Sequence, residues 1–237
     1  MIACQKDFHL GKNAKPWKRS ILHKRIATGD KDVRKSDIDA EQVLSFWFED
    51  TTSNIERLEK RGQVWFGGGP DFDRLCADRL GPALEDAADL RLEAWGATPR
   101  GRLALVILLD QIPRNVHRAS KAAFMHDAQA LAHCRAAIES AQDRALHPIE
   151  RVFLYMPMQH AEDIEIQKLS VERYTLLESE ADDSLGFLLE KSTESARIHF
   201  DIIERFGRFP HRNRVLERPS TPEEIHFLDD GGPSFGQ

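Results

Sequence analysis

Three short polar segments contain the side chains of this chain that could do chemistry. They are residues 110–115 (DQIPRN), 155–167 (YMPMQHAEDIEIQ) and 199–213 (HFDIIERFGRFPHRN). Imidazole and carboxylate groups transfer protons near neutral pH, and a guanidinium binds carboxylates or phosphates through parallel hydrogen bonds. Each segment also contains a proline, which often marks a helix end. The three segments therefore predict one polar pocket built from three helix ends.

The segment 155–167 contains the candidate acid–base pair. Pro157 is expected to interrupt an apolar helix, after which His160, Asp163 and Gln167 recur at spacings of three and four. These spacings predict that the three side chains share one helical face. His160 with Asp163 or Glu162 could transfer a proton, or the same pair could only orient a helix junction.

The segment 110–115 follows the most apolar stretch of the chain. Asp110 is expected at the C-terminal end of a helix, where the helix dipole disfavours a carboxylate, so it needs a partner. Pro113 is expected to stop this helix. Arg114 could then form a structural ion pair with Asp110 while Asn115 caps free carbonyls. Alternatively, Arg114 and Asn115 contact a ligand.

The segment 199–213 begins on a helix and ends in a cluster of basic side chains. His199 shares a face with apolar residues, which is typical of a core histidine but also fits a pocket wall. Gly207 is expected to end the helix in the left-handed conformation. The polar residues that follow are Arg208, His211, Arg212 and Asn213. They need anionic partners, either carboxylates of the protein or a ligand.

These segments define the predicted site. The predicted catalytic residues are His160, Glu162 and Asp163. The predicted ligand-binding residues are Asp110, Arg114, Asn115, Gln167, His199, Arg208, His211, Arg212 and Asn213. No metal is predicted, because the H-x-E-D spacing differs from H-E-x-x-H; the set His160, Asp163 and His199 is the less favoured metal-binding alternative. The cofactor remains unknown, and residues 67–70 (GGGP) predict a turn because they lack the Lys and Ser or Thr of a phosphate-binding loop.

Helical patterns position these segments along the chain. Helix starts are marked by a capping box at Asp39, by Thr98 followed by Pro99, by His147 followed by Pro148, and by Thr221. Residues 120–142 predict one long Ala-rich helix, and no alternating β-branched run competes with the helical pattern. The sequence therefore predicts an all-α fold of about eight or nine helices packed as antiparallel pairs, without a clean internal repeat.

Charge divides the chain into a basic arm and an acidic body. Residues 1–36 carry ten Lys or Arg and three Asp, whereas residues 37–237 carry 23 basic and 36 acidic groups. We expect a mobile arm (1–36), one helical domain (37–230) and a flexible tail (231–237). Nucleic-acid binding is disfavoured because the acidic body repels phosphate. A Lys-rich arm containing three Asp also disfavours an organellar presequence.

The lengths of the apolar runs and the spacing of the cysteines indicate the cellular compartment in which the protein is expected. The longest strongly apolar run, residues 103–109, is far shorter than the roughly 18 residues that a membrane span needs. Three widely separated cysteines indicate neither a disulfide framework nor a Cys-based zinc site. These features favour a soluble cytoplasmic protein with no membrane partner.

Six motifs resemble those of a known bacterial family, the "domain of unknown function 924" proteins. They lie at residues 43–48 (VLSFWF), 65–73 (WFGGGPDFD), 98–115, 153–167, 199–213 and 220–228, and the resemblance covers about residues 39–230. It implies a tetratricopeptide-like helical fold and no particular activity. Ile112, Gln159 and Ala161 depart from the residues usual in the family. Gln159 replaces a carboxylate beside His160, which weakens the metal alternative.

Two functional hypotheses follow. The first is a pocket for a small anionic molecule, with the possibility of acid–base catalysis. The second is a tetratricopeptide-like interaction module that holds an acidic or C-terminal peptide segment. An enclosed site should bring His160, Asp163, Arg114, His199 and His211 into one cleft, whereas a module should spread them along a groove. We favour the pocket, because short polar groups adjoin aromatic residues and proline.

Overall fold

The computed structural model describes residues 37–180 and 183–235. The predicted arm, 1–36, lies outside the described residues. Within the described part every regular element is helical and no strand occurs, so the all-α prediction is confirmed. The α-helices are α1 (Ala40–Phe48), α2 (Ile55–Gly67), α3 (Pro70–Ala88), α4 (Pro99–Val106), α5 (Ile112–Val116), α6 (Asp127–Glu139), α7 (Pro148–Gln159), α8 (Ile164–Glu180), α9 (Gly186–Phe206) and α10 (Pro222–Asp229).

Local sequence signals set the helix starts where they were predicted. Asp39 and Thr221 each accept a hydrogen bond from the backbone N–H three residues on and form complete capping boxes. The side chain of Thr98 caps α4, and His147 caps α7. These contacts satisfy backbone donors that have no partner inside the helix. At the other end of α9, Gly207 adopts the predicted left-handed conformation, with a φ of 67°.

The helix predicted over residues 120–142 is divided, and this prediction is wrong. A short 3₁₀ turn covers Lys121–Phe124, and α6 begins only at Asp127. The hydroxyl of Ser120 accepts a hydrogen bond from Ala122 N and so starts the 3₁₀ turn. At the other end, Ala141 has a φ of 56°, in the left-handed region, which ends the helical path.

Two prolines lie inside helices that they were predicted to end. Pro157 lies within α7, which continues to Gln159. Pro113 lies in α5, directly after a π-helical turn at Ile107–Gln111 that joins α4 to α5 without a break. Ile112 N bonds to Ile107 O, five residues back, whereas Pro113 has no N–H to donate. Counting α4 to α5 as one continuous helix, the described residues form nine helices, in line with the prediction.

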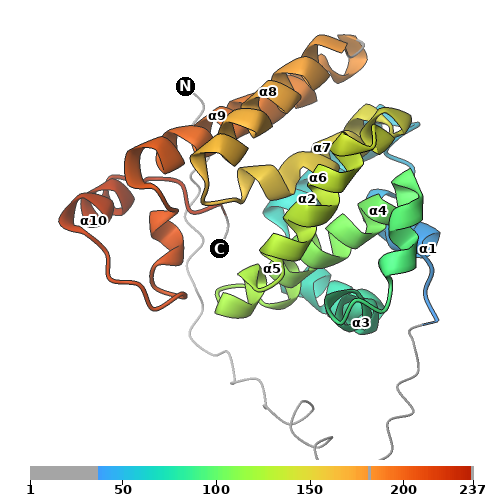
Figure 1. Cartoon of the computed structure of the whole chain (residues 1–237), viewed down its shortest axis with the longest axis horizontal. Helices are drawn as coiled ribbons and strands as arrows, with labels where there is room; N and C mark the ends of the chain where they lie inside the picture. The colour runs from blue at the N-terminus through green and yellow to red at the C-terminus, as the bar shows by residue number, and fades with distance from the viewer. Residues whose placement is uncertain (1–36, 181–182, 236–237) are drawn as a thin grey trace, which may run out of the picture. The chain divides into compact units, whose positions relative to one another are not determined.

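This continuous helix forms the centre of the core. Residues 103–109 are all at most 1% exposed, and α1, α3, α6 and α7 pack against it. Along the second half of the chain α7 packs on α8, and α8 lies beside α9 (Figure 1). Packing between consecutive helices is compatible with the predicted tetratricopeptide-like arrangement. Among the described residues no helix has the length and apolar character needed to cross a membrane.

Candidate functional site

A cavity of about 390 Å³ lies where α2, α4–α5, α7 and α9 meet. Its apolar wall consists of Trp65, Phe66, Met156 and Phe235. The polar side chains that line it are Gln111, Arg114, Asn115, Arg118, Gln159, His160, Ser195 and His199. A concave site with aromatic walls and a few polar groups is the usual form of a small-molecule site.

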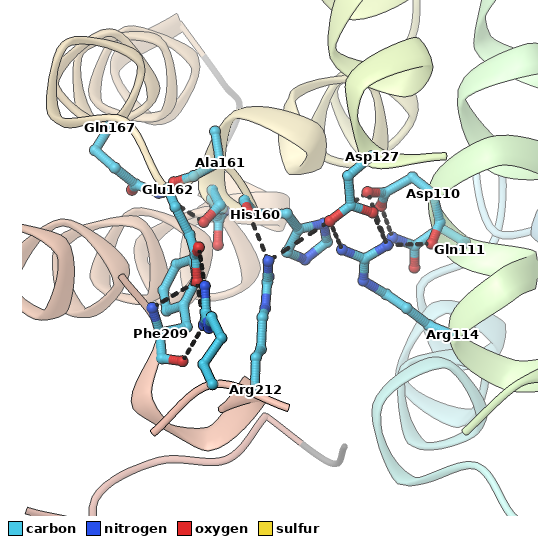
Figure 2. A network of polar contacts seen from close by, with 12 residues as sticks. Asp110, Gln111, Arg114, Asp127, His160, Ala161, Glu162, Gln167, Phe209 and Arg212 are labelled. Atoms are coloured by element: carbon cyan, nitrogen blue, oxygen red, sulfur yellow. Dashed lines mark hydrogen bonds and ion pairs between the residues drawn. The ribbon is translucent and has the colours of Figure 1, made fainter. Parts of the chain in front are cut away.

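His160 and Asp110 form the central polar contact of this cavity. Nδ1 of His160 lies 2.7 Å from Oδ1 of Asp110, whose side chain is fully buried (Figure 2). Since a carboxylate only accepts, Nδ1 carries the hydrogen and Nε2 is left with a lone pair. Among the described residues Nε2 has no hydrogen-bond partner. His160 therefore presents a free basic nitrogen to the cavity.

Arg114 holds two carboxylates beside His160. Its Nη1 lies 3.2 Å from Oδ1 of Asp110, and its two terminal nitrogens each lie 2.9 Å from an oxygen of Asp127 (Figure 2). The predicted Asp110–Arg114 ion pair is thus present, and Asn115 also caps a carbonyl, donating to Gln111 O. Arg114 and Asn115 line the cavity as well, so the structural and the ligand-facing alternatives coexist in the same residues.

The charges around His160 favour its neutral form. Burial lowers the pKa of His160, the positive charge of Arg114 lowers it further, and Asp110 acts in the opposite direction. For Asp110, burial opposes ionisation, but Arg114 and His160 outweigh burial and hold the pKa below its usual range. At neutral pH the pair is therefore a carboxylate and a neutral imidazole.

His199 is a second neutral imidazole in the cavity. Its Nδ1 donates to the carbonyl of Ser195 at 2.8 Å, and its ring centroid lies 6.2 Å from that of His160. The ring of Phe235 stacks on His199 with 3.9 Å between centroids. Burial, together with the nearby His160, lowers the pKa of His199 to about 3. The segment predicted as a flexible tail, 231–237, is described only as far as this Phe235.

Glu162 and Asp163 are not the partners of His160, and this prediction is wrong. Because α7 ends at Gln159 and α8 begins at Ile164, residues 160–163 form the junction between two helices rather than one helical face. Asp163 caps α8 by accepting from the backbone N–H of Glu165 and Ile166.

The two remaining polar residues of this segment also support the backbone. Glu162 accepts a hydrogen bond from the backbone N–H of Phe209 (Figure 2). It also accepts two hydrogen bonds from Arg218. Gln167 is fully buried and donates to the carbonyls of Gln159 and Ala161. Glu162, Asp163 and Gln167 therefore shape the helix junction that carries His160, and none of them lines the cavity.

The Arg-rich loop after α9 finds its anionic partners inside the protein. Arg208 binds both carboxylate oxygens of Glu224, at 2.6 and 2.8 Å, and Asn213 donates to the same carboxylate. Arg208 is therefore paired with a carboxylate of the protein. His211 does not line the cavity, although its ring contacts Phe235.

Arg212 connects this loop to the cavity wall. Its Nη1 donates to the carbonyl of His160 at 3.0 Å and lies 3.6 Å from Asp127 (Figure 2). The guanidinium packs over the rings of Phe124 and Phe209. Burial lowers its pKa to about 10, so it remains charged at neutral pH. Arg212 thereby fixes the backbone of His160 from the side opposite α4–α5.

The described residues contain no group of three or more His, Cys, Asp or Glu side chains arranged to hold a metal ion. Within this part of the chain His160, Asp163 and His199 are not gathered into such a group, and Asp163 accepts backbone hydrogen bonds as a helix cap.

Several lining residues were not among the predicted site residues. Gln111 and Ser195 adjoin predicted residues on the same helices, and Arg118 follows Asn115 in the turn after α5. This proximity is the signal that could have found them. Trp65 and Phe66 belong to the 65–73 motif, where only a turn was predicted. Phe235 lies in the predicted tail, and no local pattern indicates its contact with His199.

Comparison with known proteins shows which family this chain matches. The family described as "Bacterial protein of unknown function (DUF924)" matches residues 43–232. A solved structure of a protein of unknown function, ATU0120 from Agrobacterium tumefaciens, is 34% identical to this chain. The alignment covers 81% of this chain and 97% of that chain, with a TM-score of 0.68. No curated protein matches this chain. The resemblance found in the sequence is confirmed.

Proposed function

The chain belongs to the DUF924 family of bacterial proteins, and within that family we propose that its cavity binds a small polar molecule from which His160 removes a proton. The observation that carries this proposal is the hydrogen bond between Nδ1 of His160 and the buried carboxylate of Asp110. It fixes the tautomer that leaves Nε2 basic, and the carboxylate stabilises the imidazolium that forms when a proton is taken up. His160 lies on the cavity wall, where a bound molecule can reach it.

The surrounding charges suit a base that works at neutral pH. Because burial and Arg114 lower the pKa of His160, the imidazole is neutral before the reaction. The acidity of the imidazolium then allows it to return the proton to a product. Asp110 and Asp127 offset the positive charges of Arg114 and Arg212. When His160 takes up a proton, the carboxylate of Asp110, 2.7 Å away, stabilises the new positive charge.

A serine nucleophile is the competing chemistry for a histidine paired with a carboxylate. Ser195 lines the same cavity, but its hydroxyl donates to Oε1 of Gln159 at 3.0 Å. Since the hydroxyl proton points to an amide rather than to an imidazole, the geometry favours proton removal from the ligand over activation of Ser195.

The cationic side chains of the cavity favour an anionic group on the ligand. Arg114 and Arg118 line it, and no Asp or Glu is among the described lining residues. Arg118 is the more accessible of the two, with 38% of its side chain exposed while it also binds Asp73. A carboxylate or phosphate of the ligand would share this guanidinium with Asp73.

The test is a reaction assay in deuterated water. We would incubate the full chain with a defined mixture of hydroxy acids, sugar acids, sugar phosphates and amino acids, and follow each compound by mass spectrometry. Removal and return of a carbon-bound proton raises the mass of the substrate, and an elimination creates a new mass. We expect such a change with the parent protein and a loss of about 100-fold or more in its rate with His160→Asn.

His226 provides a matched control, because it forms a second His–Asp pair, with Asp230 at 3.2 Å, on the exposed surface of α10. The variant His226→Asn should react like the parent. A reaction rate that His160→Asn leaves unchanged, or the absence of any reaction in the mixture, would contradict the proposed function.

A further inference from the structure

The two histidines of the cavity use their donor groups inside the protein. Nδ1 of His160 donates to Asp110, and Nδ1 of His199 donates to the carbonyl of Ser195. A neutral imidazole has one donor and one acceptor, so each ring offers only the acceptor Nε2 to a ligand. Among the described residues neither Nε2 has a hydrogen-bond partner.

Other uncharged side chains on the wall also donate hydrogen bonds within the protein. Nε2 of Gln111 donates to Asp110, Nδ2 of Asn115 donates to Gln111 O, and Nε1 of Trp65 donates to Trp47 O. The hydroxyl of Ser195 donates to Gln159. Oε1 of Gln111 accepts no hydrogen bond within the described part of the chain. Gln111 therefore presents an acceptor to the cavity, as the two histidines do, whereas Oδ1 of Asn115 already accepts from Arg118 and Oε1 of Gln159 from Ser195.

The guanidiniums of Arg114 and Arg118 are the charged donors among the described lining residues. Arg114 lies between Asp110 and Asp127, and Arg118 binds Asp73 while more than one-third of its side chain is exposed. A ligand that fits this wall needs its own donors opposite His199 and Gln111. It needs an acceptor, most favourably an anion, opposite Arg118.

From this pattern we infer that the ligand is a polyhydroxylated anion, such as a sugar acid or a sugar phosphate, whose hydroxyl groups donate to Nε2 of His199 and to Oε1 of Gln111, while Nε2 of His160 takes up the proton. This inference rests on the proposed function and names the substrate class of the same site. The ring centroids of His160 and His199 lie 6.2 Å apart, so one small molecule can contact both rings. The aromatic side chains Trp65, Phe66 and Phe235 provide an apolar wall for the carbon chain.

Calorimetric titration of the full chain with four probes tests the inference. D-gluconate carries hydroxyls and a carboxylate, glucose 6-phosphate carries hydroxyls and a phosphate, hexanoate lacks the hydroxyls, and sorbitol lacks the charge. We expect gluconate or glucose 6-phosphate to bind at least about tenfold more tightly than both hexanoate and sorbitol. The tighter of the two anionic probes identifies the carboxylate or the phosphate as the recognised group.

Paired variants of His199 separate recognition from packing. In His199→Asn the amide nitrogen can replace Nδ1 and keep the contact with Ser195 O, but no atom replaces Nε2. In His199→Gln the longer side chain can place an oxygen near the position of Nε2. We expect His199→Asn to reduce the preference for gluconate over hexanoate by about tenfold and His199→Gln to retain part of it. Circular dichroism of both variants should match that of the parent.

The outcomes distinguish this inference from the proposed function. Equal affinity for gluconate and hexanoate, a preference that His199→Asn leaves unchanged, or no binding of either hydroxylated anion would overturn the inference. If sorbitol binds as tightly as gluconate and glucose 6-phosphate, the inference that the ligand must be an anion is overturned. A His160-dependent reaction of compounds without hydroxyls would leave the proposed function intact while rejecting the ligand class. Selective binding of gluconate without any His160-dependent reaction would reject the proposed function alone.

Discussion

Asp110 and His160 stand 50 residues apart in the chain, and their side chains share a hydrogen bond of 2.7 Å. Asp110 comes from the π-helical turn inside the most buried helix, and His160 from the junction between α7 and α8. The contact joins the core helix to the second half of the domain. The same pair is therefore expected to affect both the stability of the fold and the proposed reaction.

The substitution Asp110→Asn should lower the free energy of unfolding by about 2–3 kcal/mol. It preserves the shape of the side chain but removes a buried charge that faces Arg114 and His160, while Asp127 still offsets Arg114. Urea unfolding at pH 7 measures the effect. Asp230→Asn, on the exposed His226–Asp230 pair, should change stability by less than about 0.5 kcal/mol. Equal losses in the two variants would show that burial of Asp110 is not important.

Helix starts were predictable because their signals are local. At Asp39, Thr98 and Thr221 the capping side chain and the donor that it satisfies lie within three residues of each other. The effects of Pro113 and Pro157 were not predictable in this way. Proline removes one hydrogen bond from a helix, but both helices are buried on several sides, and tertiary packing compensates for the loss.

The proximity of Arg114, His160 and His199 around one cavity was predictable, but the hydrogen-bond partner of His160 was not. Periodicity relates a residue only to neighbours three or four positions away, so it suggested Asp163 as the partner of His160. The true partner comes from another helix, and Asp163 is a helix cap. The stacking of Phe235 on His199 is a contact between distant parts of the chain, which no local pattern encodes.

Two adjacent glutamates of α10 should differ sharply in their contributions to stability. Glu224 is 2% exposed and accepts hydrogen bonds from Arg208, Asn213 and the backbone of Thr221. Glu223 forms one exposed ion pair with Arg205. We expect Glu224→Gln to cost about 2–3 kcal/mol and Glu223→Gln less than about 0.5 kcal/mol. Thermal and chemical unfolding of both variants measure this difference, and similar values would refute it.

Gly101 should be intolerant of any side chain. A Cβ atom at this position would lie 2.2 Å from the carbonyl oxygen of Trp95 and 2.8 Å from Oγ1 of Thr98, the residue that caps α4. We expect Gly101→Ala to destabilise the protein by about 2–3 kcal/mol. Gly62, inside α2, has no atom within 4 Å of the same position, and Gly62→Ala should stabilise by about 0.5–1 kcal/mol. Unfolding curves that fail to separate the two variants would contradict the close approach at Gly101.

Mild acid should destabilise the protein through the buried imidazoles of the site. Burial lowers the pKa of His199 to about 3, whereas in the unfolded chain it is about 6.5. Below pH 6.5 the unfolded chain binds a proton at His199 that the folded protein does not bind, so stability falls as the pH falls. Between pH 7 and pH 5 the expected loss is about 2 kcal/mol for this residue.

The variant His199→Gln removes this difference in proton binding. Its free energy of unfolding should therefore fall by about 2 kcal/mol less than that of the parent between pH 7 and pH 5. Between pH 8 and pH 9 the imidazole of His199 is neutral in both the folded and the unfolded state, and the two proteins should show parallel stability curves. Parallel curves below pH 7 as well would mean that the folded protein protonates His199 readily. Nε2 of His199 would then not act as the uncharged acceptor on which the inferred recognition of hydroxyl groups depends.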